Sequence, residues 1–494
     1  MKIKRSEMPM TRRLHALRSW LDGKERRLGL VTSLDGSQLI TLVLDPRNRS
    51  AECWETPVEG DQYPSLTPSM PQCHWFERAI WDLFGLQATG HPRLKNLFLH
   101  DQYEPDFQPL RTAKKPAGIS AAAHRKYEFL KVQGDGVYEI PVGPIHAGII
   151  EPGHFRLSCL GEIILNLEIQ LGFLHRGVEK RLTAVPWPKA RFVAEAASSD
   201  TAVGNALAHA VAIETLINIE CPPRAQHLRS LALEIERLAM HIIDVGGIGV
   251  DIGYLGVAAS MGRLRGNALR LGDLIAGSRF MRGFILPGGV FRDPDRYLPA
   301  ALQLTRELRK SVEPVTAILL DNPVACERLA DVGRVSTSLA RDFGLVGVAS
   351  RASGINYDAR QHFPHGAFPE HAPPPVVETS GDALARTKVR IGELFHSLRT
   401  IEKLIESIPS GPIQEKLPEI LPGGRVGVGI VEAFRGELIH LVFTNNNGQI
   451  SRYAIKDPSF NNWTGVSIGV RNNLVADFPI CNKSFSLSYS GHDL

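Results

Sequence analysis

Six cysteines are the side chains of this 494-residue sequence best suited to bind a soft metal ion, but their spacing argues against such a site. They are widely scattered, and no two of them show the C-x-x-C spacing that brings a pair of thiolates onto one metal. Scattered free thiols are typical of a protein from a reducing compartment. The cysteines are Cys53, Cys73, Cys159, Cys221, Cys326 and Cys481.

Histidines and glycines give two weaker chemical signals. His362, His365 and His371 lie in the segment HFPHGAFPEHAPPPVVE, whose prolines exclude a helix or a central strand. No cysteine or acidic cluster with zinc spacing accompanies them, so we expect a surface loop without a metal. The glycine-rich segment at 246–253 lies inside a helical pattern and does not follow a strand, so it does not predict a dinucleotide site.

Composition limits the possible functions. The chain has 56 basic and 52 acidic residues and a net charge of +4, which is too balanced to favour nucleic-acid binding. It is too long for one hydrophobic core, so we expect at least two domains. No run of about 18 apolar residues is present, and no transmembrane helix is predicted. The basic first 27 residues indicate a solvated or partner-docking arm.

The expected elements divide the chain into two domains. Residues 1–112 indicate a small α/β domain, with strands at 29–32 and 39–44 around the turn Asp35-Gly36 and a helix at 74–86. Residues 113–137 are small, basic and rich in turn formers, which indicates a linker.

The second domain, residues 138–494, should be mostly helical. Alternation around Gly161-Glu162 predicts a β-hairpin, and a second hairpin is expected at 438–443 and 450–455. A long helix should begin at Pro222-Pro223 and end at Gly246-Gly247, and another should span 382–408. We expect an extended polar tail after the second hairpin. The predicted fold class is therefore α+β.

One motif in the first domain carries a family resemblance. The segment ERAIWDLFGLQATGHPRLKNLFLHDQYEPDFQPLR at 77–111 resembles the 30-kilodalton-type subunit of complex I, which lies beside the quinone-site subunit. Many fixed positions agree over 35 residues, which makes the resemblance specific. The resemblance implies a scaffold and not a catalyst, and we expect His91 to be a loop residue.

Five motifs in the second domain resemble the large subunits of [NiFe] hydrogenases and of complex I. They are VGPIHAGIIEPGHFRL (142–157), GFLHRGVEK (172–180), PPRAQHLRSLALEIERLAMHI (222–242), ASRASGINYDAR (349–360) and EAFRGELIHLVF (432–443). A fusion of both modules is the arrangement of the formate hydrogenlyase and hydrogenase-4 type of energy-converting hydrogenase. The chain is similar to that branch over nearly its whole length.

The resemblance also implies where nickel ligands should stand. Family members hold the [NiFe] centre with four thiolates in two C-x-x-C pairs. Here Ser198 and Thr201 occupy the positions of the first pair, and Ser459 and Asn462 are expected at those of the second. Neutral hydroxyl and amide groups are weak ligands for nickel, so we expect no nickel–iron centre and no hydrogenase activity.

Quinone binding is the next chemistry that the resemblance suggests. His146 matches a histidine that contacts the quinone headgroup in complex I, and His154 lies close to a second histidine of that loop. The matching tyrosine position falls near Ser199. Two family residues beside the terminal iron–sulfur cluster are replaced, at Ala196 and at Met281-Arg282. The resemblance therefore implies a possible quinone site that keeps only part of its polar contacts.

Several charged residues match functional positions of the family. Glu151 stands where hydrogenases keep a proton-relaying glutamate, and burial can raise the pKa of such a carboxyl toward neutrality. Arg435 matches an arginine over the hydrogenase centre, and Asp358 is expected to line the same interior. These three are the catalytic candidates. His175 and Arg176 are expected to face a small partner subunit that carries a [4Fe–4S] cluster.

Two hypotheses of function follow. In the first, the chain is an oxidoreductase subunit that takes electrons from the iron–sulfur partner to a quinone or an unidentified acceptor. In the second, it is a non-redox subunit that bridges this partner and an ion-translocating membrane arm. Both imply antiporter-like and quinone-chamber membrane partners, and a peripheral place at the cytoplasmic face of the inner membrane. Any NADH chemistry would belong to another subunit.

Overall fold

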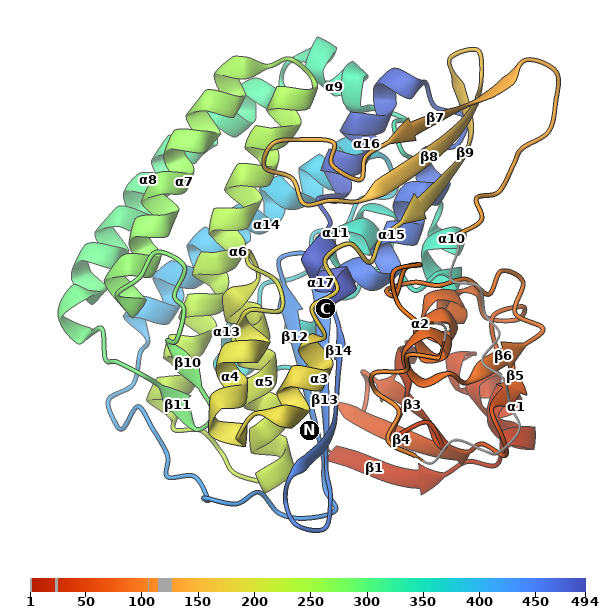
Figure 1. The fold of residues 1–494 in the computed structure, drawn as a ribbon. Helices are drawn as coiled ribbons and strands as arrows, with labels where there is room; N and C mark the ends of the chain where they lie inside the picture. Colours follow the sequence, from red (N-terminus) through yellow and green to blue (C-terminus); the bar gives the residue numbers. More distant parts are fainter. Residues whose placement is uncertain (1, 23–24, 105, 114–126) are drawn as a thin grey trace.

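The computed structural model describes residues 2–22, 25–104, 106–113 and 127–494, so most of the predicted linker lies outside the described residues. Two folded parts lie side by side (Figure 1). The smaller one holds a four-stranded sheet in the order β1-β4-β3-β2, in which β1 and β4 are parallel. Its main elements are β1 (Lys2–Glu7), α1 (Met10–Leu21), β2 (Arg27–Ser33), β3 (Gln38–Asp45), β4 (Ser50–Pro57), β5 (Gln62–Pro64), α2 (His74–Phe84) and β6 (Gln87–Thr89). The predicted strands and helix of this domain are confirmed as β2, β3 and α2.

The motif of the first domain folds around α2 and is structural. Glu77 is fully buried, and its carboxylate accepts hydrogen bonds from Ser65, Thr67 and the backbone of Leu66. The Asp82 carboxylate accepts the backbone N–H groups of the loop at 97–99. Buried carboxylates with several donors fix a loop firmly, since leaving those donors unpaired is costly.

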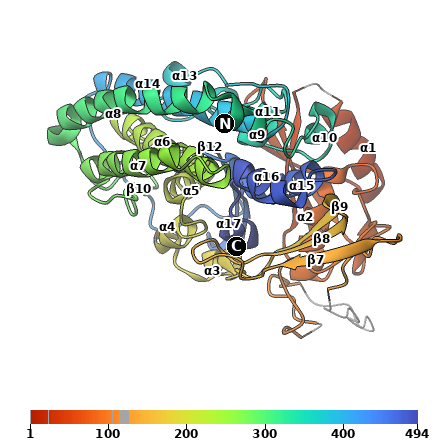
Figure 2. The ribbon, with the colours of Figure 1, turned by 90° about the horizontal axis from the view of Figure 1, so that it is seen from above.

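Long helices form the body of the second part. Figure 2 shows α6, α7, α8 and α14 running beside one another. The helices up to α8 are α3 (Val178–Ala184), α4 (Trp187–Glu195), α5 (Ala202–Ile217), α6 (Pro223–Asp251), α7 (Leu255–Ala276) and α8 (Leu298–Leu320). Five short helices and one long one follow: α9 (Pro323–Leu329), α10 (Thr337–Asp342), α11 (Gly347–Ala352), α12 (Ala359–His362), α13 (Phe368–His371) and α14 (Ala383–Glu406).

The prediction that Gly246-Gly247 ends α6 is wrong. The helix begins at Pro223, as expected, but continues to Asp251. A Cβ atom on Gly246 would lie 3.0 Å from Met261 Cβ, and one on Gly249 would lie 3.2 Å from the backbone of Ala258. These glycines therefore allow α6 and α7 to approach closely.

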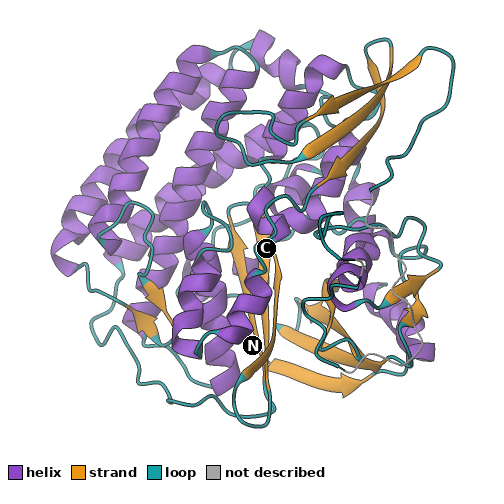
Figure 3. Ribbon diagram, in the orientation of Figure 1, coloured by secondary structure: helices purple, strands orange, loops and turns teal. Residues whose placement is uncertain are grey.

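Two three-stranded antiparallel sheets complete this domain (Figure 3). The first contains β7 (Val137–Val142), β8 (His154–Leu160) and β9 (Ile163–Gln170), and the second β12 (Val426–Ala433), β13 (Gly436–Thr444) and β14 (Ile450–Lys456). Both predicted hairpins are present, each with one additional strand. A two-stranded ribbon of β10 (Ile285–Leu286) and β11 (Gly289–Val290) lies apart from them.

The C-terminal tail is helical, which corrects the expectation of an extended segment. It forms α15 (Pro458–Gly469), α16 (Phe478–Phe485) and α17 (Tyr489–Asp493). The Asp457 carboxylate caps α15 by accepting Ser459 N–H, and Pro458 occupies its first turn. The Ser488 hydroxyl caps α17 through Gly491 N–H. Capping residues of this kind start helices even where the apolar pattern is weak.

The two domains contact each other through arginines of both parts. Arg452 of β14 donates to Thr32 Oγ1 at 2.7 Å and to the Ser33 carbonyl at 3.0 Å. Arg27 of β2 lies 4.3 Å above the ring of Tyr357. Among the described helices, none combines the length and the apolar character needed to cross a bilayer.

Candidate functional site

The candidate site forms where the N-terminus of α5 meets the turn between β12 and β13. Arg435 follows β12 and makes a two-pronged ion pair with Asp200, at 2.8 and 2.7 Å. It also donates to Thr201 Oγ1 at 3.3 Å and to the Ser486 carbonyl. Planar guanidinium and carboxylate groups match in this geometry, so the pair fixes both segments.

A group of buried hydroxyls surrounds this ion pair. Ser198 donates to Asp200 Oδ1 at 3.0 Å and lies 3.0 Å from the Ser488 hydroxyl. The Ser459 hydroxyl accepts Ser488 N–H at 2.9 Å, and the Ser488 and Ser490 hydroxyls are 3.4 Å apart. We call Ser198, Thr201, Ser459, Ser488 and Ser490 the hydroxyl cluster. All five residues are at most 5% exposed.

Asn462, the other residue expected at a ligand position of α15, makes its side-chain hydrogen bonds to Val346 and none to the hydroxyl cluster among the described residues. Its side-chain amide accepts Val346 N–H at 3.0 Å and donates to the Val346 carbonyl at 3.1 Å. Ser488 lies opposite Ser198 instead, and the motifs in the sequence did not identify it. Ser488 and Gly491 are three positions apart, as are Ser198 and Thr201. This repeated spacing, just after α16, is the sequence signal that could have identified Ser488.

Glu151 lies next to the hydroxyl cluster and contacts it through the backbone. Its Oε2 accepts Ser490 N–H at 3.0 Å. A chain of polar contacts thus runs from Glu151 through residues 490 and 488 to Ser198 and Asp200. The carboxyl of Glu151 is only partly buried.

Asp358 lies apart from Arg435, against the expectation that both line one interior. Its carboxylate pairs with Arg360 at 2.6 Å, and it also lies 3.9 Å from Arg351. It belongs to a second buried set of charges between α6, α11, α14 and β12. The strand end that carries Ala433 and Arg435 links the two sets, because Arg237 donates to the Ala433 carbonyl at 2.7 Å.

His146 lies in the loop between β7 and β8, and His154 is the first residue of β8. His146 Nε2 is 3.3 Å from the Tyr489 hydroxyl, and the His154 ring contacts the Gly143 carbonyl at 3.2 Å. The same loop exposes Ile145 and Ile149, which are 86% and 98% accessible. Burial lowers the pKa of His154.

His175 and Arg176 bind the segment at 486–494. Arg176 donates to the carbonyls of Ala196, Ala197 and Ser490 at 2.9, 2.7 and 3.1 Å. The His175 ring stacks on Phe98, and its Nδ1 lies 2.7 Å from the Asp493 carbonyl. Both residues therefore have structural contacts within this chain. Their expected contact with an iron–sulfur partner stays a prediction.

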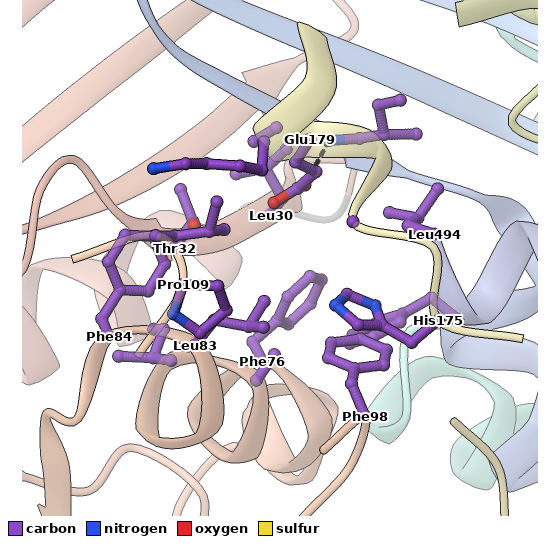
Figure 4. Close-up of a pocket in the computed structure, with 18 of the residues that line it drawn as sticks. Leu30, Thr32, Phe76, Leu83, Phe84, Phe98, Pro109, His175, Glu179 and Leu494 are labelled. Atoms are coloured by element: carbon purple, nitrogen blue, oxygen red, sulfur yellow. Dashed lines mark hydrogen bonds between the residues drawn. The ribbon is translucent and has the colours of Figure 1, made fainter. Parts of the chain in front are cut away.

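An apolar cavity of about 60 Å³ lies at the junction of the two domains, next to His175. Figure 4 shows Phe76, Phe98 and His175 on one side and Leu30 with Glu179 across the opening. The carboxylate of Glu179 pairs with Arg452 at 2.9 Å. None of the hydroxyl cluster lines this cavity.

The pKa values of two carboxyls near the site are shifted in opposite directions. Burial raises the pKa of Asp200, but Arg435 outweighs this and holds it below its ordinary value. Burial raises the pKa of Glu236 to about 8, although its oxygens accept Val203 N–H and Gly204 N–H. Desolvation penalises the charged form of a carboxyl, and a nearby cation favours it.

The donor set around Asp200 does not suit a nickel–iron centre. Such a centre needs several soft thiolates, whereas this site offers neutral hydroxyls, one carboxylate and a guanidinium. The carboxylate is already bound by the guanidinium. Over the described part of the chain, histidines, cysteines and acids do not gather in groups of three or more that could hold a metal ion.

Comparison with known proteins gives two family matches. The family described as "Respiratory-chain NADH dehydrogenase, 30 Kd subunit" matches residues 13–119. The family described as "Respiratory-chain NADH dehydrogenase, 49 Kd subunit" matches residues 251–428. The two matches fall in the two domains of the structure, and they confirm the resemblance drawn from the motifs.

Relatives and a solved structure extend the likeness to most of the chain. Formate hydrogenlyase subunit 5 of Escherichia coli is 31% identical over 481 residues, which cover 93% of this chain and 82% of that protein. Hydrogenase-4 component G of the same organism is 30% identical, with coverages of 90% and 78%. The C/D subunit of NADH-quinone oxidoreductase from Phocaeicola vulgatus is 29% identical, with coverages of 88% and 86%.

A chain of the membrane-bound sulfane sulfur reductase, an archaeal respiratory membrane complex, superposes with a TM-score of 0.69. It is 26% identical, and the match covers 73% of this chain and 99% of that chain.

Proposed function

Because the chain belongs to the family of large subunits that includes formate hydrogenlyase subunit 5 and hydrogenase-4 component G, we propose that it is a nickel-free subunit of a membrane-associated oxidoreductase complex. In this complex it takes electrons from an iron–sulfur partner to a quinone or another acceptor. The chain itself holds no nickel–iron centre and does not make hydrogen.

The observation that carries the proposal is the hydroxyl cluster. Ser198, Thr201 and Ser488 gather around the Asp200–Arg435 ion pair, where family resemblance places the metal-binding positions. Each of these hydroxyls already has a protein partner. Hydroxyls in such a network are poor ligands for a soft metal, because binding would break their hydrogen bonds and supply no thiolate.

A quinone is the acceptor that the remaining polar groups suit best. The Tyr489 hydroxyl lies 3.3 Å from His146 Nε2 and is able to donate a hydrogen bond to a carbonyl oxygen. His146 is able to do so through Nε2 as an imidazolium, because its Nδ1–H is bound to the Pro144 carbonyl. The exposed isoleucines of the same loop offer apolar surface to a partner or to an apolar tail. Relatives named NADH-quinone oxidoreductase add support for this substrate class.

A second candidate function is a non-redox coupling subunit. The observation that favours it is the complete internal pairing of Arg435, whose guanidinium contacts Asp200, Thr201 and Ser486. A site closed by such contacts would hold the fold and transmit changes of charge without transferring electrons. In both cases we propose peripheral attachment at the cytoplasmic face of the membrane, through membrane-embedded partner subunits.

Metal analysis and low-temperature EPR of the native complex, purified through a tag on this subunit, test the proposal. We expect no nickel, and an iron–sulfur signal after dithionite reduction that also responds to quinol. One nickel per chain would overturn the nickel-free assignment. A cluster that responds to dithionite but not to quinol would overturn the quinone acceptor, and absence of a responsive cluster would favour the coupling subunit.

Two variants sharpen this experiment. His146→Ala and Tyr489→Phe should each weaken the response to quinol and leave the response to dithionite unchanged. His371→Ala is a suitable control, because His371 ends α13 and its ring contacts Ser407 and His227. Equal effects of all three variants would speak against a quinone contact at His146.

A further inference from the structure

A buried set of charges between α6, α11, α14 and β12 is not used by the proposed function. It contains three arginines, four acids and one histidine, all at most 1% exposed. The residues are Glu234, Arg237, His241, Arg351, Asp358, Arg360, Glu393 and Glu432. We call this set the buried charge network.

The contacts within the network are short and specific. Glu393 accepts from Arg237 at 2.6 Å and from Arg351 at 2.8 Å. Arg360 contacts Asp358 at 2.6 Å and Glu234 at 2.8 Å. Such pairs are strong only when every charge is compensated, since an uncompensated charge in a protein interior is very costly.

The network contains one carboxylate more than it has permanent cations. Three guanidinium groups face four carboxyls, so complete ionisation would leave one uncompensated negative charge. His241, whose Nε2 lies 3.2 Å from Glu393, does not balance it, because burial lowers its pKa. Neutrality therefore requires one proton on one of the four carboxyls.

The surrounding groups do not supply the missing cation. Asp244 and Arg390, the next pair along α6 and α14, compensate each other at 2.6 Å. Glu437 is compensated by Lys456 at 2.7 Å. Arg27 lies beyond it, 3.9 Å from Glu437, and is partly exposed, so solvent screens its charge.

Glu432 is the carboxyl with the weakest cationic support. Among the residues that the structure describes, its carboxylate contacts one guanidinium, that of Arg351 at 2.7 Å, and accepts Ala359 N–H at 2.9 Å. Each of the other three carboxyls lies near two guanidinium groups. Glu393 contacts Arg237 and Arg351, and Asp358 contacts Arg360 and lies 3.9 Å from Arg351. Glu234 contacts Arg360 at 2.8 Å and lies 3.7 Å from Arg237. Arg351 Nη1 is also shared, because it lies 3.9 Å from Asp358.

We propose that Glu432 is a proton-binding site, which takes up and releases one proton while the other three carboxylates of the network stay ionised. The ligand is a single proton, and the reaction is the conversion of a carboxylate to a carboxylic acid. Burial raises the pKa of Glu432 to about 7, Asp358 adds to this and Arg351 opposes it. Arginine keeps the pKa of Asp358 low, at about 2.

The position of Glu432 connects this proton to the candidate site. Arg237 donates to the carbonyls of Glu432 and Ala433 at 3.1 and 2.7 Å. Arg435 follows two residues after Ala433 and pairs with Asp200. A change of charge at Glu432 therefore acts on the strand end that leads to Arg435, whose guanidinium contacts Asp200 and Thr201.

Infrared spectroscopy of the full chain in H₂O and D₂O tests the proposal. We expect a protonated-carboxyl stretching band that shifts in D₂O, is lost in Glu432→Gln, and titrates in the wild type with a pKa of about 7. Glu437→Gln is the matched control, because Glu437 is equally buried but compensated by Lys456. The band should persist in this variant and titrate at lower pH, because Lys456 is left without its counter-charge.

Two more variants complete the test. One keeps a carboxyl at position 432 in case Glu432→Gln does not fold, and the other removes Glu236, another buried carboxyl with a raised pKa. Glu432→Asp keeps a carboxyl and should shift the band without removing it. Glu236→Gln should remove only a separate component that titrates about one pH unit higher. Persistence of the neutral-pH band in Glu432→Gln, or an unchanged band in Glu432→Asp, would overturn the proposal.

Discussion

The side-chain oxygens of Ser198 and Ser488 lie 3.0 Å apart although 290 positions separate the two residues in the sequence. Ser198 precedes α5, and Ser488 caps α17. The contact therefore brings the C-terminal helices against the start of α5. It also defines which positions of the chain face one another in the candidate site.

Three cysteines placed at facing positions should create a metal site. In Ser198→Cys/Thr201→Cys/Ser488→Cys we expect one Zn²⁺ or Co²⁺ per chain, because three thiolates and a water satisfy tetrahedral coordination. The absorption of the cobalt form measures thiolate ligation. Gly491 is left unchanged, since a Cβ there would lie 2.5 Å from Asp457 Oδ2.

The control for this design carries Asn462→Cys in place of Ser488→Cys. The side chain at position 462 lies against the backbone of Val346, so a thiolate there is less well placed to complete the site. This variant should bind the metal about tenfold more weakly or worse. Equal affinity of the two variants would contradict the assignment of Ser488 to the site.

Asp200→Asn should destabilise the protein by about 1–2 kcal/mol at pH 7, because it leaves the buried Arg435 guanidinium without its counter-charge. This range is reduced because the Asp200 side chain is 37% exposed. Arg435 outweighs burial and lowers the pKa of Asp200, so its stabilisation is present above the pKa of an unfolded aspartate, about 4, and is lost as pH falls further.

Urea midpoints at several pH values measure this effect. The difference between wild type and Asp200→Asn should shrink below about pH 4, where the unfolded aspartate is protonated. Asp342→Asn, at an exposed position, should show no such difference. A difference that stays constant with pH would mean that the ion pair contributes little.

Arg176→Ala should loosen the segment at 486–494. The change removes four hydrogen bonds from a charged donor to backbone carbonyls, one of which holds Ser490 in this segment, and we expect a loss of about 1–3 kcal/mol. Hydrogen–deuterium exchange should rise in this segment and not in α6. Lys180→Ala, an exposed change close by, should leave exchange unaltered, and equal exchange in both variants would contradict the role of Arg176.

Ala454→Val should stabilise the junction of the domains by up to about 1 kcal/mol, because the added methyl groups fill apolar space in the cavity. Thermal unfolding measures the gain. Ala190→Val is the comparison, since Ala190 is fully buried in α4 and does not line the cavity, and overpacking there should cost about 1–3 kcal/mol. Destabilisation by both changes would indicate that the cavity cannot accept a side chain.

Periodicity and turn chemistry were sufficient for most of the fold. The alternation on either side of Gly161-Glu162 predicted β8 and β9, and Pro222-Pro223 predicted the start of α6. The end of α6 was wrong because glycine can end a helix or allow a close helix contact. Only the neighbouring α7, which the local sequence does not contain, decides between these roles.

The candidate site was less accessible to sequence reasoning. The family resemblance identified Ser198 and Thr201 on one side, but the opposite side depends on which distant residue the fold brings near. Ser459 and Ser488 both belong to the hydroxyl cluster, and the Ser459 hydroxyl accepts the backbone N–H of Ser488. Asp358 and Arg435 were grouped because both match the family, whereas the network of arginines holds Asp358 elsewhere.

Both domains occupy one polypeptide, and this has a consequence for the contacts that Arg452 makes with Thr32 and Ser33. Covalent linkage gives the two surfaces an effective concentration of roughly millimolar, so their docking does not depend on how much protein the cell contains. A junction that joins these hydrogen bonds to apolar contacts, such as those of Trp75 and Phe76 with the Phe460 ring, then stays closed at any protein concentration.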